Sequence, residues 1–231
     1  MKIHGLQKMT LLDYPGRVAC TVFLGGCDLC CPFCHNAELI DGTAEPVMDD
    51  AALLAFLEKR RGLLDGVAFT GGEPTLRRDL PDLFRKIKAL GYPIKLDTNG
   101  LHPDRLRALL EEGLVDYVAM DVKNSPAMYA QTCGTERVDL DKITESIELL
   151  KHAGIDYEFR TTVVDELHRQ EDFVEIGKWI AGAKGYYLQG FVDRDSVVFE
   201  NFHAPTMERM KLYSETVRDF VQKVEIRGME S

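Results

Sequence analysis

The chain alternates short apolar runs with longer stretches in which apolar residues recur at helical spacing. Six runs have the length and composition of β-strands, at residues 18–23, 66–70, 94–98, 117–121, 157–163 and 186–189. The stretches between them predict amphipathic helices, such as the one that carries Leu83, Phe84 and Ile87 before Gly91. The pattern is therefore strand, helix, strand along most of the chain.

This alternation predicts parallel strands that are joined by right-handed helical crossovers. Six strand–helix units fit an α/β fold of the partial (β/α)6 TIM-like barrel type. We expect one domain over residues 1–231, with a functional loop at residues 24–36 and a closing helix at about residues 205–224.

Composition excludes several classes of partner. The formal net charge of -10 disfavours binding to nucleic acid. Neither a signal peptide nor an apolar run long enough to cross a bilayer is present, so we expect no membrane partner and a cytoplasmic location. In that reducing compartment, a tight group among the six cysteines indicates metal or redox chemistry rather than disulfides.

Three cysteines follow the first predicted strand at the spacing C-x3-C-x2-C, namely Cys27, Cys31 and Cys34. Thiolates this close together can bind three corners of a [4Fe–4S] cluster, whereas an electron-carrying cluster normally has four protein thiolates. The open iron can bind the amino and carboxylate groups of S-adenosylmethionine (SAM), and an electron from the cluster can then cleave SAM to a 5′-deoxyadenosyl radical.

A structural zinc site is the noncatalytic alternative for this loop. It would use Cys27, Cys34, Cys30 or Cys31, and His35. Zinc is disfavoured because the chain has no second cysteine pair downstream, and Cys30 is interpreted as a neighbouring thiol, since a fourth cluster ligand would block SAM. The isolated Cys20 and Cys133 are interpreted as small buried or incidental residues.

Polar residues gather at the carboxyl ends of the other predicted strands, where parallel α/β barrels have their active sites. Two glycines at the end of the second strand let a ligand approach the backbone, and Glu73 adds a carboxylate there. The later strand ends carry carboxylates and cations that can face one pocket. Together, the candidate ligand-binding residues at the strand ends are Gly71, Gly72, Glu73, Asp97, Asp121, Lys123, Arg160 and Gln189. Arg160 is either a paired core arginine or a ligand contact, and Gln189 is equally open.

The cysteine motif followed by Gly71-Gly72-Glu73-Pro74 resembles the radical SAM superfamily. Residues 5–16, 23–27 and 34–36 resemble the anaerobic ribonucleoside-triphosphate reductase activating proteins, which are kin to pyruvate formate-lyase activating enzyme. This resemblance runs along nearly the whole chain. It implies an enzyme that abstracts hydrogen from a glycine of a large partner and leaves a stable glycyl radical.

The resemblance also implies roles for single residues. The cluster would be held by Cys27, Cys31 and Cys34, with Phe33 against the cluster and the adenine. The amino end of SAM would lie on Gly71, Gly72 and Glu73, and further SAM contacts would come from Lys123, Arg160 and, in place of a histidine of the relatives, Gln189. A monovalent-cation site near the SAM carboxylate would consist of Asp97, Thr98 and Asp121.

The expected function is thus activation of anaerobic ribonucleoside-triphosphate reductase, with a [4Fe–4S] cluster and SAM as cofactors and flavodoxin or ferredoxin as electron donor. Three alternatives stay open at this point. They are activation of another glycyl-radical enzyme, a radical SAM reaction on a small molecule like that of 7-carboxy-7-deazaguanine synthase, and a noncatalytic zinc-binding module.

Overall fold

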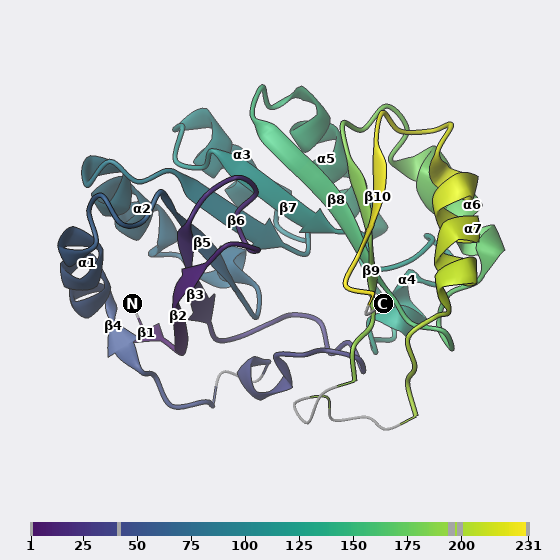
Figure 1. Cartoon of the computed structure of the whole chain (residues 1–231), viewed down its shortest axis with the longest axis horizontal. Helices are drawn as coiled ribbons and strands as arrows, with labels where there is room; N and C mark the ends of the chain where they lie inside the picture. The colour runs from purple at the N-terminus through teal and green to yellow at the C-terminus, as the bar shows by residue number, and fades with distance from the viewer. Residues whose placement is uncertain (1, 41–42, 194–196, 198–200, 230–231) are drawn as a thin grey trace. The chain divides into compact units, whose positions relative to one another are not determined.

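The computed structural model describes residues 2–40, 43–193, 197 and 201–229. The chain divides into two compact units, whose helices and strands are labelled in Figure 1. The first comprises residues 1–28, 38–98 and 102–119, and the second comprises residues 29–37, 99–101 and 120–231.

The first unit holds parallel strands in the order β6-β5-β3, extended by β2, which is antiparallel to β3. Its strands are β1 (Lys2–Ile3), β2 (Gly5–Thr10), β3 (Ala19–Leu24), β4 (Met48–Asp49), β5 (Gly66–Gly71) and β6 (Ile94–Thr98). Its helices are α1 (Asp50–Lys59), the short 3₁₀ helix η2 (Pro74–Leu76), α2 (Leu80–Ala89) and α3 (Pro103–Glu111). A further 3₁₀ turn, η1 (Ala37–Leu39), lies in the chain segment that passes from the second unit back to the first.

Strand β7 (Tyr117–Asp121) begins in the first unit and ends in the second. The second unit continues with β8 (Asp156–Val163), β9 (Tyr186–Gly190) and β10 (Val224–Arg227), and β9 lies parallel to both β8 and β10. Its helices are α4 (Tyr129–Thr132), α5 (Leu140–His152), α6 (Gln170–Trp179) and α7 (Met207–Val217).

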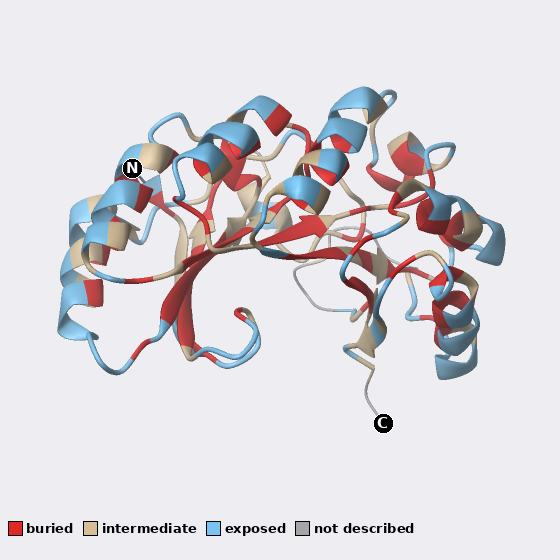
Figure 2. Ribbon diagram, turned by 90° about the horizontal axis from the view of Figure 1, so that it is seen from above, coloured by how far each residue is buried: buried red, intermediate tan, exposed pale blue. Residues whose placement is uncertain are grey.

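The helices bury the apolar stripe that their sequences predict. In α2, Leu83, Phe84 and Ile87 are at most 2% exposed, and Gly91 follows the helix with φ +89°, a conformation that glycine adopts without strain. Figure 2 shows the same pattern elsewhere, with buried residues on strands and on inward helix faces, and exposed residues on the outer helix faces. Among the described residues, no helix is long and apolar enough to span a bilayer.

The predicted α/β class and all six predicted strands are confirmed, to within one residue at each end. The closing helix is shorter than predicted, because α7 ends at Val217 and the chain turns into the unpredicted strand β10. Strand β2 was also missed. Three of its six residues are exposed and only one is buried, and its sequence has no regular apolar alternation.

Candidate active site

Backbone hydrogen bonds fix the start of the cysteine loop within the first unit. The loop leaves β3 through Gly26, which has φ +93°. The amide of Gly26 donates to the carbonyl oxygen of Leu39 (2.7 Å), and the amide of Cys27 donates to that of Ile40 (2.9 Å). Cys27 is partly exposed and therefore reachable by a metal centre.

The rest of the loop, with Cys31 and Cys34, belongs to the second unit. The amide of Cys34 donates to the carbonyl oxygen of Cys31 (3.1 Å), so these two residues form one tight turn. Between them Phe33 is 4% exposed and packs with Val164 and Phe191, and Cys31 lies against this apolar cluster. The turn thus presents two partly exposed cysteines next to a cluster of buried apolar side chains.

Cys133 contacts this turn, which the sequence did not suggest. Its carbonyl oxygen accepts a hydrogen bond from the amide of Cys30 (3.2 Å), and its buried side chain is hydrogen-bonded to Cys31. That bond lowers the pKa of Cys31 to about 7 against the opposing effect of burial, with help from the positive charge of Lys123. By contrast, burial raises the pKa of Cys34. The environment of Cys31 therefore favours a thiolate, the form that binds metals.

The cysteines fit an iron–sulfur cluster in their chemistry. All six lie in the described part of the chain and none forms a disulfide. Among the described residues, no three His, Cys, Asp or Glu side chains converge on one point as ligands of a single metal ion would. A cubane needs no such convergence, because each thiolate binds a different iron.

The end of β5 approaches the cysteine loop backbone within the first unit. The amide of Gly72 donates to the carbonyl oxygen of Leu24 (2.8 Å), and the amide of Glu73 donates to that of Gly26 (2.7 Å). A Cβ atom on Gly72 would lie 2.1 Å from the oxygen of Gly26, and one on Gly71 would lie 2.4 Å from that of Leu24. Glycine is required here for backbone packing, in addition to any role in ligand approach.

The Glu73 carboxylate is 1% exposed and satisfied by neighbours. Its Oε1 atom accepts hydrogen bonds from the amide and hydroxyl of Thr75 (3.0 and 2.5 Å) and from the hydroxyl of Thr98 (2.8 Å). These contacts connect the end of β5, η2 and the end of β6. Glu73 thus has a clear structural role, and its contact with the SAM amino group stays a prediction.

Strand β6 also holds an ion pair that sequence reasoning missed. The ammonium of Lys95, which is 2% exposed, contacts the carboxylate of Asp97. Alternate residues of a strand lie on the same side, so Lys95 and Asp97 are neighbours there. A lysine between the apolar residues Ile94 and Leu96 was the sequence signal for a buried ion pair.

In the second unit, Asp121 lies between two cations. Its Oδ1 atom is 2.9 Å from Arg160 Nε and its Oδ2 atom is 2.8 Å from Lys123 Nζ. Burial would raise the pKa of Asp121, but the charges of Arg160 and Lys123 outweigh it and hold the pKa below its usual range. Conversely, burial would lower the pKa of Lys123, and Asp121 with Cys31 keeps it well above normal. All three side chains therefore carry charge at neutral pH.

The open question about Arg160 is answered in part, since it pairs with Asp121. Gln189 lies in β9, partly exposed, in register with Thr162 of β8 and Arg227 of β10. Neither residue's contact with SAM is tested by this arrangement.

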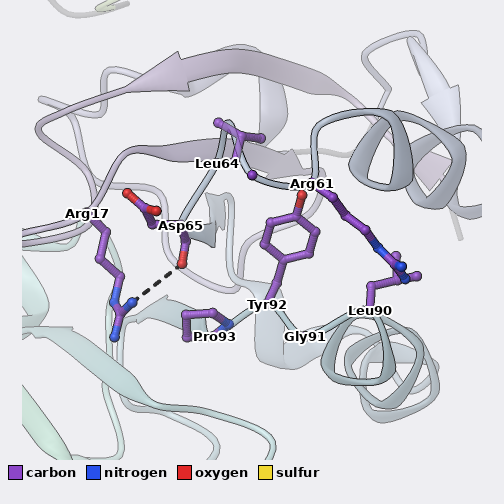
Figure 3. Close-up of a pocket in the computed structure, with 9 residues that line it drawn as sticks. Arg17, Arg61, Leu64, Asp65, Leu90, Gly91, Tyr92 and Pro93 are labelled. Atoms are coloured by element: carbon purple, nitrogen blue, oxygen red, sulfur yellow. Dashed lines mark hydrogen bonds between the residues drawn. The ribbon is translucent and has the colours of Figure 1, made fainter.

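A pocket of about 420 Å³ lies in the first unit and is shown in Figure 3. Arg17, Arg61, Asp65 and Tyr92 line it, and the guanidinium of Arg17 donates to the carbonyl oxygen of Asp65 (3.5 Å). Asp65 directly precedes β5, so the pocket lies at the opposite end of that strand from Gly71. It is therefore separate from the predicted SAM contacts of this unit.

Comparison with known proteins identifies the family. The model of the radical SAM superfamily matches residues 21–180. A Methanocaldococcus jannaschii protein, whose name assigns it provisionally to the glycyl-radical enzyme activating enzymes, is 30% identical over 97% of this chain and 95% of its own length. The 7-carboxy-7-deazaguanine synthase of Thermococcus kodakarensis is 27% identical over 88% of this chain and 83% of its own length.

The fold comparison agrees. Streptococcus suis SuiB bound to S-adenosylmethionine superposes with a TM-score of 0.70 at 13% identity, over 91% of this chain and 52% of that one. On the matched family model and the near full-length relative, this chain belongs to the radical SAM superfamily, whose enzymes use a [4Fe–4S] cluster and SAM, and it is kin to the glycyl-radical enzyme activating enzymes.

Proposed function

We propose that this radical SAM enzyme generates a glycyl radical on anaerobic ribonucleoside-triphosphate reductase. The observation that carries the proposal is the 30% identity, over 97% of the chain, to a relative whose name places it among the glycyl-radical enzyme activating enzymes. The resemblance of residues 5–16, 23–27 and 34–36 to the reductase activators supports the choice of partner.

The chain's own residues would perform three tasks. Cys27, Cys31 and Cys34 would hold the [4Fe–4S] cluster, which when bound supplies the electron that cleaves SAM to the 5′-deoxyadenosyl radical. The lowered pKa of Cys31 supports this role, because metals bind thiolates. The apolar cluster around Phe33 would keep water from the reacting centre, and the backbone at Gly71 and Gly72 would receive the amino end of SAM.

Lys123 and Arg160 would contact the charged groups of SAM. Their shared partner Asp121 holds both in place, and His168 fixes the backbone of Lys123, since the His168 Nε2 atom lies 2.9 Å from the Lys123 carbonyl oxygen. A preorganised cationic pair of this kind binds a carboxylate at low conformational cost.

The proposed reaction requires a reductant for the cluster, and flavodoxin or ferredoxin is the donor that we expect. We also expect the enzyme in the cytoplasm, where a reducing environment keeps thiols available for iron.

The test mixes anaerobically reconstituted protein with dithionite, SAM and the candidate reductase. Electron paramagnetic resonance should show the doublet of a glycyl radical, with one 5′-deoxyadenosine formed per radical. A reductase variant whose radical-site glycine is replaced by alanine should give no doublet. Formation of 5′-deoxyadenosine without any protein radical would reject the reductase as partner, and other glycyl-radical enzymes would then be tested in the same assay.

A second candidate is a reaction on a small molecule. The 27% identity over 88% of the chain to a 7-carboxy-7-deazaguanine synthase favours it. Incubation with the substrate of 7-carboxy-7-deazaguanine synthase discriminates the two candidates, because only the second candidate predicts turnover of a small molecule in the absence of a protein partner.

A further inference from the structure

Lys95 is a charged residue that is buried within strand β6 of the first unit. Its side chain is 2% exposed, and its neighbours in β6, Ile94 and Leu96, are fully buried. Lysine is almost never buried to this degree unless its ammonium is paired. Here the partner is the carboxylate of Asp97, two residues later on the same side of the strand.

Asp97 is also one of the three residues for which the family resemblance implies a monovalent-cation site. The described contacts do not suit such an ion. Each predicted ligand is already engaged within its own unit, because Asp97 contacts Lys95, and the Thr98 hydroxyl donates to Glu73 at 2.8 Å. Asp121 is held between Lys123 and Arg160 at 2.8 and 2.9 Å.

Charge explains why a further cation is disfavoured. Like the hard cations Ca²⁺ and Mg²⁺, K⁺ takes oxygen ligands, and a positively charged side chain on the same carboxylate competes with it. At Asp97 the Lys95 ammonium already supplies one positive charge. A K⁺ ion bound beside it would be repelled by this like charge, and water screens the repulsion little because both side chains are largely buried. The ammonium also has three donors, so it can contact Asp97 and a further oxygen together.

We propose that the Lys95 ammonium takes the place of a dissociable monovalent cation at Asp97, so that this enzyme binds and cleaves SAM without K⁺ or Na⁺. Lys95 is a positioning residue in this proposal, because it acts on SAM through Asp97. The proposal depends on the SAM site proposed above and is independent of which glycyl-radical enzyme is the partner.

The first test uses the reconstituted holoenzyme and needs no variant. SAM cleavage is measured in KCl, NaCl and choline chloride at equal ionic strength, and binding of Tl⁺, a K⁺ analogue, is followed by thallium nuclear magnetic resonance. We expect the same cleavage rate in all three salts and no saturable broadening of the Tl⁺ signal. Stimulation of the rate by K⁺ over choline, or saturable Tl⁺ binding, would overturn the proposal.

The second test moves the charge. In Lys95→Met the Asp97 carboxylate loses its ammonium, so we expect saturable Tl⁺ binding and a several-fold stimulation of SAM cleavage by K⁺. Lys86→Met is the matched control, since Lys86 lies on α2 with 57% of its side chain exposed and should behave as wild type. If Lys95→Met does not fold, Lys95→Met with Asp97→Asn removes both charges and should fold without binding Tl⁺. Folded Lys95→Met that shows neither effect would contradict the proposal.

These readouts separate the two proposals. Absence of 5′-deoxyadenosine in every salt would count against the proposed function, whereas the Tl⁺ signal reports on Lys95 whether or not SAM is cleaved.

Discussion

Replacement of Gly72 by alanine tests how tightly the end of β5 and the cysteine loop are packed. A Cβ atom at this position would lie 2.1 Å from the carbonyl oxygen of Gly26, 2.7 Å from its carbonyl carbon and 3.2 Å from its nitrogen. The obstructing atoms are backbone, so no side-chain rotation can relieve the clash. To restore even 3.0 Å, the Gly26 carbonyl and the alanine must separate by about 0.9 Å.

The cost follows from that displacement. Overpacking of a rigid site costs about 1–3 kcal/mol. The bond from the Glu73 amide to the Gly26 oxygen, now 2.7 Å, would also be weakened or lost, and a hydrogen bond of this kind contributes about 1 kcal/mol. We therefore expect Gly72→Ala to lower the free energy of unfolding by about 2–4 kcal/mol. Because Gly26 precedes Cys27, we also expect weaker SAM binding and less bound iron.

Urea unfolding gives the stability change, and calorimetric titration of the reconstituted protein gives the SAM affinity. Gly154→Ala is the control, since Gly154 has φ +71° and a Cβ atom there would have no neighbour within 4 Å. It should cost about 1–2 kcal/mol from the left-handed backbone alone and leave SAM affinity unchanged. A Gly72→Ala protein within about 0.5 kcal/mol of wild type, with unchanged SAM affinity, would refute the reasoning.

Three further predictions concern single side chains. Cys31→Ala should abolish 5′-deoxyadenosine formation, whereas Cys30→Ala should retain it with a full cluster; equal loss in both would make Cys30 a ligand. Asp121→Asn should cost about 3 kcal/mol of stability at pH 7 by leaving Arg160 with a weakened partner. Because the folded pKa of Asp121 lies below its unfolded value, that difference should shrink as pH falls below about 4 in urea titrations, and a constant difference would contradict the ion pair. Burial lowers the pKa of His168, so the unfolded chain binds its proton first and stability should fall as pH drops below about 6.5. His168→Gln should remove the loss of stability below about pH 6.5. If the stability of the variant fell with pH as steeply as that of wild type, His168 would not be the titrating group.

The parts of the fold that follow from local pattern were predictable. The strands at residues 94–98 and 117–121 are short, contain buried apolar residues and are bounded by turn residues, and the structure has them at the same positions. The glycines after α2 and α5, Gly91 and Gly154, have the positive φ expected of helix ends. In these segments local propensity and burial favour the same structure, so the strands and helix ends could be predicted from this one sequence.

Features that depend on tertiary contact were not predictable. Strand β10 gains its order from pairing with β9, and its sequence between Val224 and Arg227 is half polar. The sequence indicates that Cys133 is a small buried or incidental residue, and the structure does bury it. Nothing in the sequence around Cys133 indicates its contact with the loop around Cys31, because that loop lies about a hundred residues earlier. The family resemblance implies that Asp97 is a cation ligand, and it does not include the contact of Asp97 with Lys95 that the structure shows.

The central claim is that three cysteines leave one iron of the cluster open for SAM. Mössbauer spectroscopy of protein reconstituted with iron-57 tests it most directly, in paired samples with and without SAM. We expect SAM to change the Mössbauer parameters of a single iron of the cubane and to leave those of the other irons unchanged. Four irons that are all insensitive to SAM, or a protein that binds no iron at all, would contradict it.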